Sequence, residues 1–178
     1  VPNDYVLMLR DCFNQALRAK GIKDRRFEAV GSVNPYRAGW REALNRLADR
    51  GVTTIKWLPN AMGIDPADAH LVPFYKVMAA RGLILLSHTG IERALIAPPE
   101  QQRFGDPRRL RLALDNGVTV VMAHGARAGE AVDSEGTAIA NFDLFLAMMK
   151  EGRYRGRLFG EISALGLPGT IGHFRRIA

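Results

Sequence analysis

The sequence has very little cysteine and no long apolar run. Cys12 is the single cysteine among 178 residues, so no disulfide can form within the chain, as is typical of proteins from a reducing compartment. No apolar run approaches the roughly 18 residues of a membrane span, and the first residues lack the regions of a signal peptide. We therefore expect a cytoplasmic protein without a membrane partner, in which Cys12 is a small core residue on an amphipathic helix.

Motifs for nucleotides and nucleic acids are also missing. No G-x-G-x-x-G follows a predicted strand and there is no P-loop, so the sequence lacks the phosphate-binding loops of dinucleotide and NTPase folds. The net charge of +7 suits an anionic partner, but the arginines are dispersed and no aromatic residues interleave with them, as an RNA-binding surface would need. We expect no nucleic-acid partner; a basic nucleic-acid-binding α/β protein is an alternative that steeply salt-dependent binding would reveal.

Hydrophobic residues make up 47% of the chain, enough for a single domain spanning residues 1–178. Apolar periodicity and glycine or proline boundaries predict alternating helices and strands. The predicted helices cover residues 6–20, 38–51, 72–82, 106–117 and 141–152, with another beginning near 168; the predicted strands cover 26–33, 52–59, 83–88, 118–124 and 157–163. Because the strands alternate with helices and are rich in Val, Ile and Leu, we expect an α/β fold with a parallel sheet covered on both faces.

The predicted strands end at regular intervals. Lys56, His88, His124 and Glu161 stand at the ends of four of them, separated by 32, 36 and 37 residues. The connections after strands are long and polar, while those before strands are single turns such as "DRGVTT". This asymmetry is typical of a (β/α)8 TIM barrel, whose active site is built by the loops at the carboxyl ends of the strands. An open doubly wound sheet is the alternative.

Two of these strand ends carry a histidine followed by small residues, in "LILLSHTG" and "VTVVMAHGA". Neutral imidazoles are common ligands of zinc and similar ions, and a catalytic zinc site uses about three protein ligands. His88 and His124 are therefore candidate metal ligands, with hydrogen-bonded structural histidines as the alternative. Alternate residues of a strand lie on the same face. We therefore expect shared faces for Lys56 and Thr54; for His88, Ile84 and Leu86; for His124, Val120 and Met122; and for Glu161, Phe159 and Ser163.

The other polar strand ends have more than one interpretation. Lys56 would bind metal only when carboxylated or deprotonated, and would otherwise orient an anionic substrate. Glu161 is a candidate site residue that could instead pair with an arginine. His70 is expected to be structural or exposed, and His173 to lie on the surface.

The segment "GVTTIKWLPNAMGID…VPFYKVMAARGLILLSHTG" resembles the amidohydrolase superfamily. It is most similar to the amidohydrolase-2 type, which includes the aminocarboxymuconate-semialdehyde decarboxylase-like enzymes. The shared features are G-x-x-x-x-K-x-x-P, P-F-Y and H-T-G, followed by "VMAHGA" and "LFGEISA". In this sequence they are Gly51, Lys56 and Pro59; Pro73, Phe74 and Tyr75; His88, Thr89 and Gly90; His124; and Glu161. The resemblance covers residues from about 26 to 165.

The resemblance implies a metal-dependent TIM barrel that hydrolyses C–N or C–O bonds of a small molecule, or decarboxylates aromatic or unsaturated acids. His88 would match the fifth-strand metal ligand, and His124 the sixth-strand histidine that binds metal or acts on substrate or water. Lys56 would match the fourth-strand lysine that bridges two metals when carboxylated. With Glu161, Lys56 and His124 form the predicted catalytic set. The expected cofactor is a divalent metal, zinc or manganese, and the expected assembly is a homo-oligomer.

Two departures from the family pattern matter. The family's first strand carries H-x-H or E-x-H and its eighth carries a metal-binding Asp. We expect neither here, because no H-x-H occurs in this sequence and no eighth strand is predicted. A full barrel needs about 250 residues, so these residues are expected to cover roughly strands 3 to 7. A non-catalytic scaffold fragment that needs a partner chain is therefore a further alternative.

Overall fold

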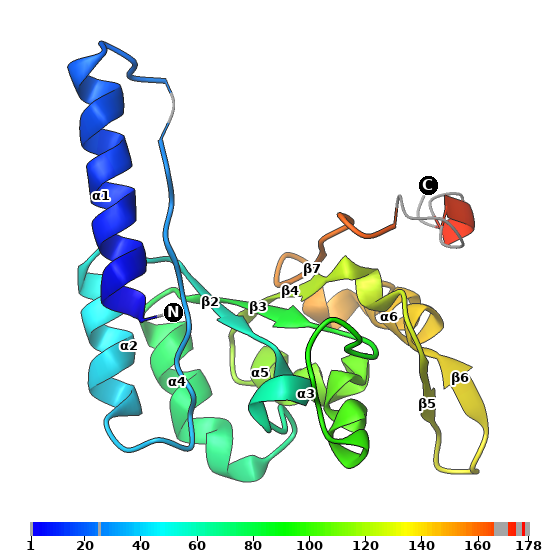
Figure 1. The fold of residues 1–178 in the computed structure, drawn as a ribbon. Helices are drawn as coiled ribbons and strands as arrows, with labels where there is room; N and C mark the ends of the chain where they lie inside the picture. Colours follow the sequence, from blue (N-terminus) through cyan, green and yellow to red (C-terminus); the bar gives the residue numbers. More distant parts are fainter. Residues whose placement is uncertain (1, 25, 166–170, 174–175, 177–178) are drawn as a thin grey trace.

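Five parallel strands form the central sheet (Figure 1) of the computed structural model, which describes residues 2–24, 26–165, 171–173 and 176. They are β1 (Val30–Gly31), β2 (Thr54–Trp57), β3 (Ile84–His88), β4 (Thr119–Ala123) and β7 (Leu158–Gly160). They pair in the order β1-β2-β3-β4-β7. Each crossover moves one strand in the same direction, as in a (β/α)8 barrel, whereas the order reverses in a doubly wound sheet. The predicted α/β fold and partial barrel are confirmed, and the doubly wound alternative is wrong.

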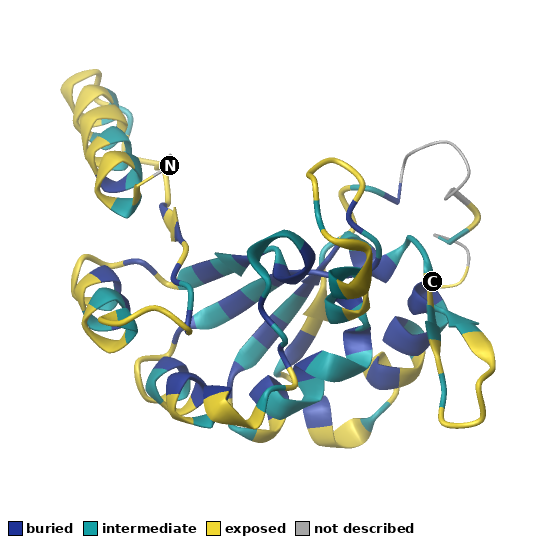
Figure 2. Ribbon diagram, turned by 60° about the horizontal axis from the view of Figure 1, so that its bottom comes forward, coloured by how far each residue is buried: buried dark blue, intermediate teal, exposed yellow. Residues whose placement is uncertain are grey.

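Helices cover one face of the sheet. They are α2 (Trp40–Asp49), α4 (Val72–Ala80), α5 (Arg111–Asp115) and α6 (Asn141–Met149). Buried and partly buried residues alternate along the strands (Figure 2). Ile55, Leu85 and Val120 are completely buried, and burying each such side chain contributes about 1.5–3 kcal/mol. Burial on both faces was expected, but the second face is only partly covered, since it is the face that would line the inside of a closed barrel.

Three helices end in the same turn before the next strand. Gly51, Gly82 and Gly117 each have a positive φ of 63–84°, a backbone conformation that side chains with a Cβ rarely adopt. The next amide in each case bonds back to the helix, as Leu83 does to the carbonyl of Met78 at 2.8 Å. These glycine caps reverse the chain within a few residues, which confirms the predicted single turns.

Several predicted boundaries are wrong in detail. The first predicted strand shortens to two residues, because the segment before it pairs with side chains of α1 (Asn3–Ala19) instead of with β2. The helix predicted over 106–117 divides into η3 (Pro107–Leu110) and α5. The predicted loops also hold α3 (Pro59–Met62), η1 (Ala69–Leu71), η2 (Pro99–Gly105), η4 (His124–Ala126), η5 (Gly152–Tyr154) and the antiparallel pair β5 (Glu130–Val132) and β6 (Ala138–Ala140).

The predicted last helix lies mostly outside the described residues. The part that is described includes η6 (Ile171–His173). His173, expected on the surface, is partly buried because its ring stacks on Phe142 with centroids 3.9 Å apart. His70 is exposed, as expected, with its side chain 93% accessible.

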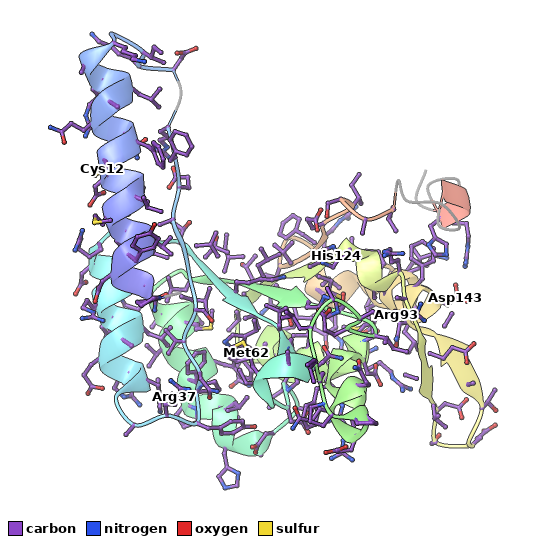
Figure 3. All side chains as sticks on the ribbon, in the orientation of Figure 1. Cys12, Arg37, Met62, Arg93, His124 and Asp143 are labelled. Carbon is purple, nitrogen blue, oxygen red and sulfur yellow. The ribbon has the colours of Figure 1, made fainter. Side chains whose placement is uncertain are left out.

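Helix α1 projects away from the sheet (Figures 1 and 3), and most of its surface faces solvent. Cys12 is exposed there, so its prediction as a core residue is wrong. The amphipathic pattern predicts a helix correctly, but only the first turns of α1 join the core, through Leu7, and its outer part packs on the extended segment before β1. Phe13 therefore stays 49% exposed even on the apolar side. None of the described helices is long and apolar enough to span a membrane.

Candidate active site

The predicted site residues meet at the carboxyl ends of the strands. Lys56, His88 and His124 line one cavity of about 310 Å³, within the size range of small-molecule sites. The other lining residues are Leu58, Thr89, Ile91, Glu92, Arg93, Ala94, Arg127, Ala128 and Ala164. Parallel strands bring residues more than 30 positions apart to the same edge of the sheet, which is why regular sequence spacing becomes proximity here.

His88 is the last residue of β3 and is largely buried, with 9% of its surface accessible. Its Nδ1 lies 3.7 Å from Oε2 of Glu92. Its Nε2 is buried and has no hydrogen-bond partner among the described residues, which is costly for a polar atom unless a ligand satisfies it. Burial lowers the pKa of His88, although Glu92 opposes this, so the imidazole is neutral at pH 7 and its free nitrogen is a Lewis base.

His124 reaches the cavity through an unusual turn. The prediction that it shares a strand face with Val120 and Met122 is wrong, because both of those side chains are completely buried in the core. Strand β4 ends at Ala123, and the next three residues have positive φ values of 63°, 54° and 51°. A left-handed conformation costs about 1–2 kcal/mol for a residue with a Cβ. This strained turn re-aims His124 toward the site, and such strain often marks functional positions.

Glu161 and Ser163 hold His124 in place. The backbone amide of His124 donates to Oε2 of Glu161 at 3.2 Å, and its Nδ1 lies 3.3 Å from Oγ of Ser163 and 3.5 Å from Oε2 of Glu161. Ser163 in turn donates its amide to Glu161. Partial burial raises the pKa of Glu161, but these hydrogen bonds outweigh it and leave the pKa below its usual value. Glu161 is thus an ionised carboxylate that orients an imidazole.

The two histidines are arranged alike. Their ring centroids are 5.3 Å apart, and each has a carboxylate near Nδ1. Within the described part of the chain, Nε2 of both rings has no protein partner. Metal-binding histidines commonly donate their second ring nitrogen to a carboxylate; here the carboxylates stand close to that nitrogen, at 3.7 Å and 3.5 Å, without a hydrogen bond. Burial lowers the pKa of His124 as well, with help from the charge of Lys56.

Lys56 supplies positive charge to the same cavity. It lies on β2 beside Leu86 of β3, on the face that a closed barrel would enclose. Burial lowers its pKa, although the carboxylates of Glu161 and Glu92 oppose the shift. A lysine with a lowered pKa is easier to deprotonate, as carboxylation requires, and its ammonium form attracts anions.

Three residues of the cavity escaped the sequence analysis: Glu92, Arg93 and Arg127. Glu92 is 7% exposed, and its carboxylate also accepts from the amide of Leu95 at 3.1 Å. Its only sequence signal is a position four residues after His88. Figure 3 shows Arg93 near His124, at the same end of the sheet. The arginines carry no pattern that distinguishes them from other loop arginines.

Close backbone contacts fix the loops that carry these residues. The amide of Gly90 donates to the carbonyl of Gly105 at 2.8 Å. The buried amide of Asn60 donates to the carbonyls of Gly90 at 3.2 Å and Gln102 at 3.0 Å. The loop after β3 is therefore attached to η2, and this attachment keeps Glu92 beside His88.

The donor set fits part of a divalent metal centre. Two imidazoles with free Nε2 atoms and a carboxylate near each Nδ1 suit zinc or a similar divalent ion. Across residues 2–24, 26–165, 171–173 and 176, however, no group of three or more His, Cys, Asp or Glu side chains is placed to hold a metal ion. These residues would thus supply two ligands and leave the rest of the coordination sphere to other groups.

Comparisons with known proteins place the chain in a family. The family profile described as amidohydrolase matches residues 4–167. Among solved structures, the chain is similar to a Metarhizium anisopliae IDCase in apo form, with 16% identity and a TM-score of 0.44. That match covers 71% of this chain and 40% of the other, so the chain spans less than half the length of that protein. No curated protein matches. Because the profile covers nearly the whole sequence, the chain belongs to the amidohydrolase family, in its amidohydrolase-2 branch.

Proposed function

We propose that this chain carries part of the active site of a metal-dependent enzyme that acts on a small acidic molecule. The observation that supports this most is the pair of strand-end histidines, each with a carboxylate near Nδ1 and a free Nε2. Family membership supports a hydrolase or decarboxylase type of chemistry. The reaction would be hydrolysis of a C–N or C–O bond, or loss of CO2 from an aromatic or unsaturated acid.

The residues of the chain have distinct roles in this proposal. His88 and His124 would hold a divalent metal through Nε2, and a metal bound there supplies Lewis acidity toward a substrate oxygen. Glu161 keeps His124 in its orientation through the contacts at Nδ1 and the backbone amide. Lys56 supplies a positive charge or, when carboxylated, a bridging carboxylate.

The charge of the cavity supports an acidic substrate. Among the described lining residues, Lys56, Arg93 and Arg127 are cations and Glu92 supplies a carboxylate, while the carboxylate of Glu161 acts on Lys56 from beside the cavity. The carboxylate of Glu92 already accepts hydrogen bonds from two backbone amides, so part of its negative charge is stabilised by the protein itself. The remaining positive charge favours a substrate with a carboxylate group, which both hydrolysis and decarboxylation can use.

Metal removal tests the proposal. We expect protein from the intact gene to contain about one or two equivalents of zinc or manganese, and a chelator to abolish turnover of lactones, amides or aromatic acids until metal is restored. Elemental analysis and an activity screen measure both results. Protein that carries no metal and binds none on addition would refute the proposal and favour a scaffold.

Replacing Arg127 tests the substrate charge. In Arg127→Ala we expect KM to rise about tenfold to a hundredfold with little change in kcat, because a charge-assisted contact worth about 1.5–3 kcal/mol is lost in ground and transition states alike. Arg155→Ala is the matched control, since Arg155 is exposed and lines a different cavity. An unchanged KM in Arg127→Ala would show that this arginine does not bind the substrate.

A further inference from the structure

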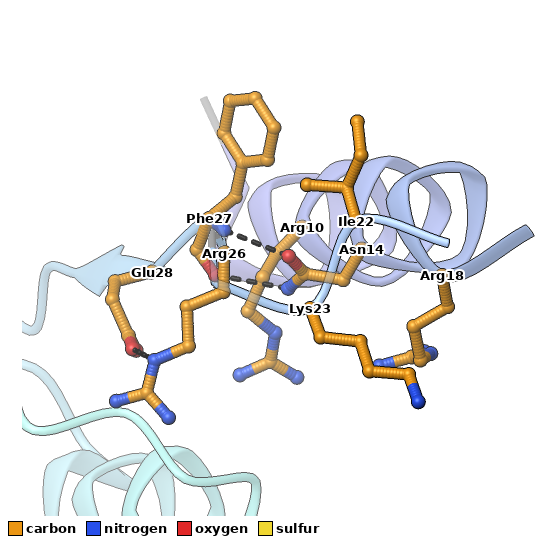
Figure 4. Close-up of a pocket in the computed structure, with 8 residues that line it drawn as sticks. All are labelled: Arg10, Asn14, Arg18, Ile22, Lys23, Arg26, Phe27 and Glu28. Atoms are coloured by element: carbon orange, nitrogen blue, oxygen red, sulfur yellow. Dashed lines mark hydrogen bonds and ion pairs between the residues drawn. The ribbon is translucent and has the colours of Figure 1, made fainter. Parts of the chain in front are cut away.

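A second cavity, at the outer end of α1, is lined mainly by positive charge (Figure 4). Its volume is about 390 Å³, and it lies between α1 and the chain that returns to β1. The lining residues are Arg10, Asn14, Arg18, Ile22, Lys23, Arg26, Phe27 and Glu28. It shares no residue with the candidate active site, and we call it the basic groove.

The two walls of the groove are held at a fixed spacing. The side-chain amide of Asn14 donates to the carbonyl of Phe27 at 2.9 Å and accepts from its amide at 2.7 Å. Asn3 makes the same pair of bonds with Ser32, at 2.8 Å and 3.0 Å. From Asn3 to Asn14 the helix advances eleven residues, or about 16 Å. From Phe27 to Ser32 the extended chain advances five residues, also about 16 Å. The two elements therefore match in length and run antiparallel, so the groove is formed before any ligand binds.

Two of the four cations in the groove already have ion-pair partners, although Asp11, the partner of Arg10, also pairs with Arg50. Arg10 pairs with Asp11 at 2.8 Å, and Arg26 pairs with Glu28. Neither Arg18 nor Lys23 has an ion-pair partner in the described ranges. Figure 4 shows the side chains of Arg10, Arg18, Lys23 and Arg26 extending to the same side of the groove. Two unpaired cations match the double negative charge of a phosphate monoester.

The rest of the groove suits the organic part of such a ligand. Ile22 and Phe27 contribute apolar surface beside the cations, and Phe27 is 49% exposed. The cavity is larger than a phosphate group needs. Charge is also concentrated here along the chain, because residues 18–26 contain five basic residues and one acidic residue.

We infer that the basic groove binds the phosphate group of a small organic phosphate, with Arg18 and Lys23 contacting the phosphate oxygens and Phe27 contacting the organic part. Arginine binds phosphate oxygens through two parallel N–H donors, and lysine binds them as a point charge. The site is separate from the proposed catalytic cavity, so the inference does not depend on the reaction.

Calorimetric titration with phenyl phosphate, and with inorganic phosphate for comparison, tests this inference. We expect saturable binding of phenyl phosphate with a Kd in the millimolar range or below, and weaker binding of inorganic phosphate. The double variant Arg18→Gln/Lys23→Gln should weaken binding at least tenfold. The control Lys76→Gln/Lys150→Gln removes the same charge from exposed positions outside the groove and should change the Kd less than twofold.

A third variant separates charge from architecture. Asn14→Ala keeps every cation but releases Phe27 from α1, so it should also weaken binding while circular dichroism shows a folded protein. Three results would overturn the inference: no saturable binding of phenyl phosphate, an equal loss of affinity in the control variant, or tighter binding of a single-stranded oligonucleotide or anionic vesicles than of phenyl phosphate.

Discussion

Replacing His88 with alanine is expected to remove metal binding and lower turnover about a thousandfold or more, since a metal contributes several kcal/mol to transition-state stabilisation. The reason is the buried Nε2 of His88, which bonds to no group in the part of the chain that the structure describes. Elemental analysis of the purified variant and steady-state kinetics measure the two effects. His70→Ala is the matched control, because the side chain of His70 is 93% accessible; it should keep both metal and activity.

The same variant distinguishes a ligand from a structural histidine. Alanine removes an unsatisfied buried nitrogen together with some packing, so we expect the unfolding free energy of the metal-free protein to change by only about 1 kcal/mol. A structural histidine would behave in the opposite way: metal content would be unchanged while the metal-free protein lost about 2 kcal/mol or more. That outcome would remove His88 from the proposed metal site.

Replacing Gly105 with alanine is expected to destabilise the protein by about 3 kcal/mol, at the upper end of typical overpacking costs. A Cβ at this position would lie 2.0 Å from the carbonyl oxygen of Gly90 and 2.9 Å from the amide nitrogen of Asn60. Backbone oxygen cannot move aside as a flexible side chain can, so the two loops must separate. Thermal unfolding should show a melting temperature lower by about 10 °C.

Gly152→Ala is the matched control for this prediction. A Cβ there would meet no heavy atom within 4 Å, and the melting temperature should stay the same or rise slightly. Loop separation in Gly105→Ala should also weaken metal binding, because it displaces Glu92 from His88. An unchanged melting temperature in Gly105→Ala would show that the loop after β3 and η2 are not in contact.

Secondary-structure elements whose formation depends on residues close in sequence could be predicted from the sequence. The apolar period of α4 and the glycine caps at Gly51, Gly82 and Gly117 act within a few residues, so pattern and structure agree there. The regular spacing of strand ends predicted the barrel-like order, since each β–α unit must return the chain to the start of the next strand. His88 was placed correctly because it is still inside β3, where alternation holds.

The sequence failed where a side chain's position depends on distant parts of the chain. Cys12 lies on a correctly predicted helix, yet no periodicity shows whether another element covers that helix. His124 was assigned to the wrong strand face because alternation ends at Ala123, where three left-handed residues begin. Glu92 became a site residue only because Asn60 and Gly105 hold its loop against the sheet.

The sequence by itself determined the α/β class, the order of elements and the identity of the strand-end residues Lys56, His88 and His124. The physical reason is that helix periods, strand composition and glycine turns are local properties of the chain. Only the tertiary structure decided which charges share the cavity, how Glu161 orients His124, and that α1 and the segment before β1 form a basic groove. Those features depend on strand register, strained turns and contacts between residues far apart in the chain, such as the amide of His124 with Glu161, 37 positions away, which no local pattern records.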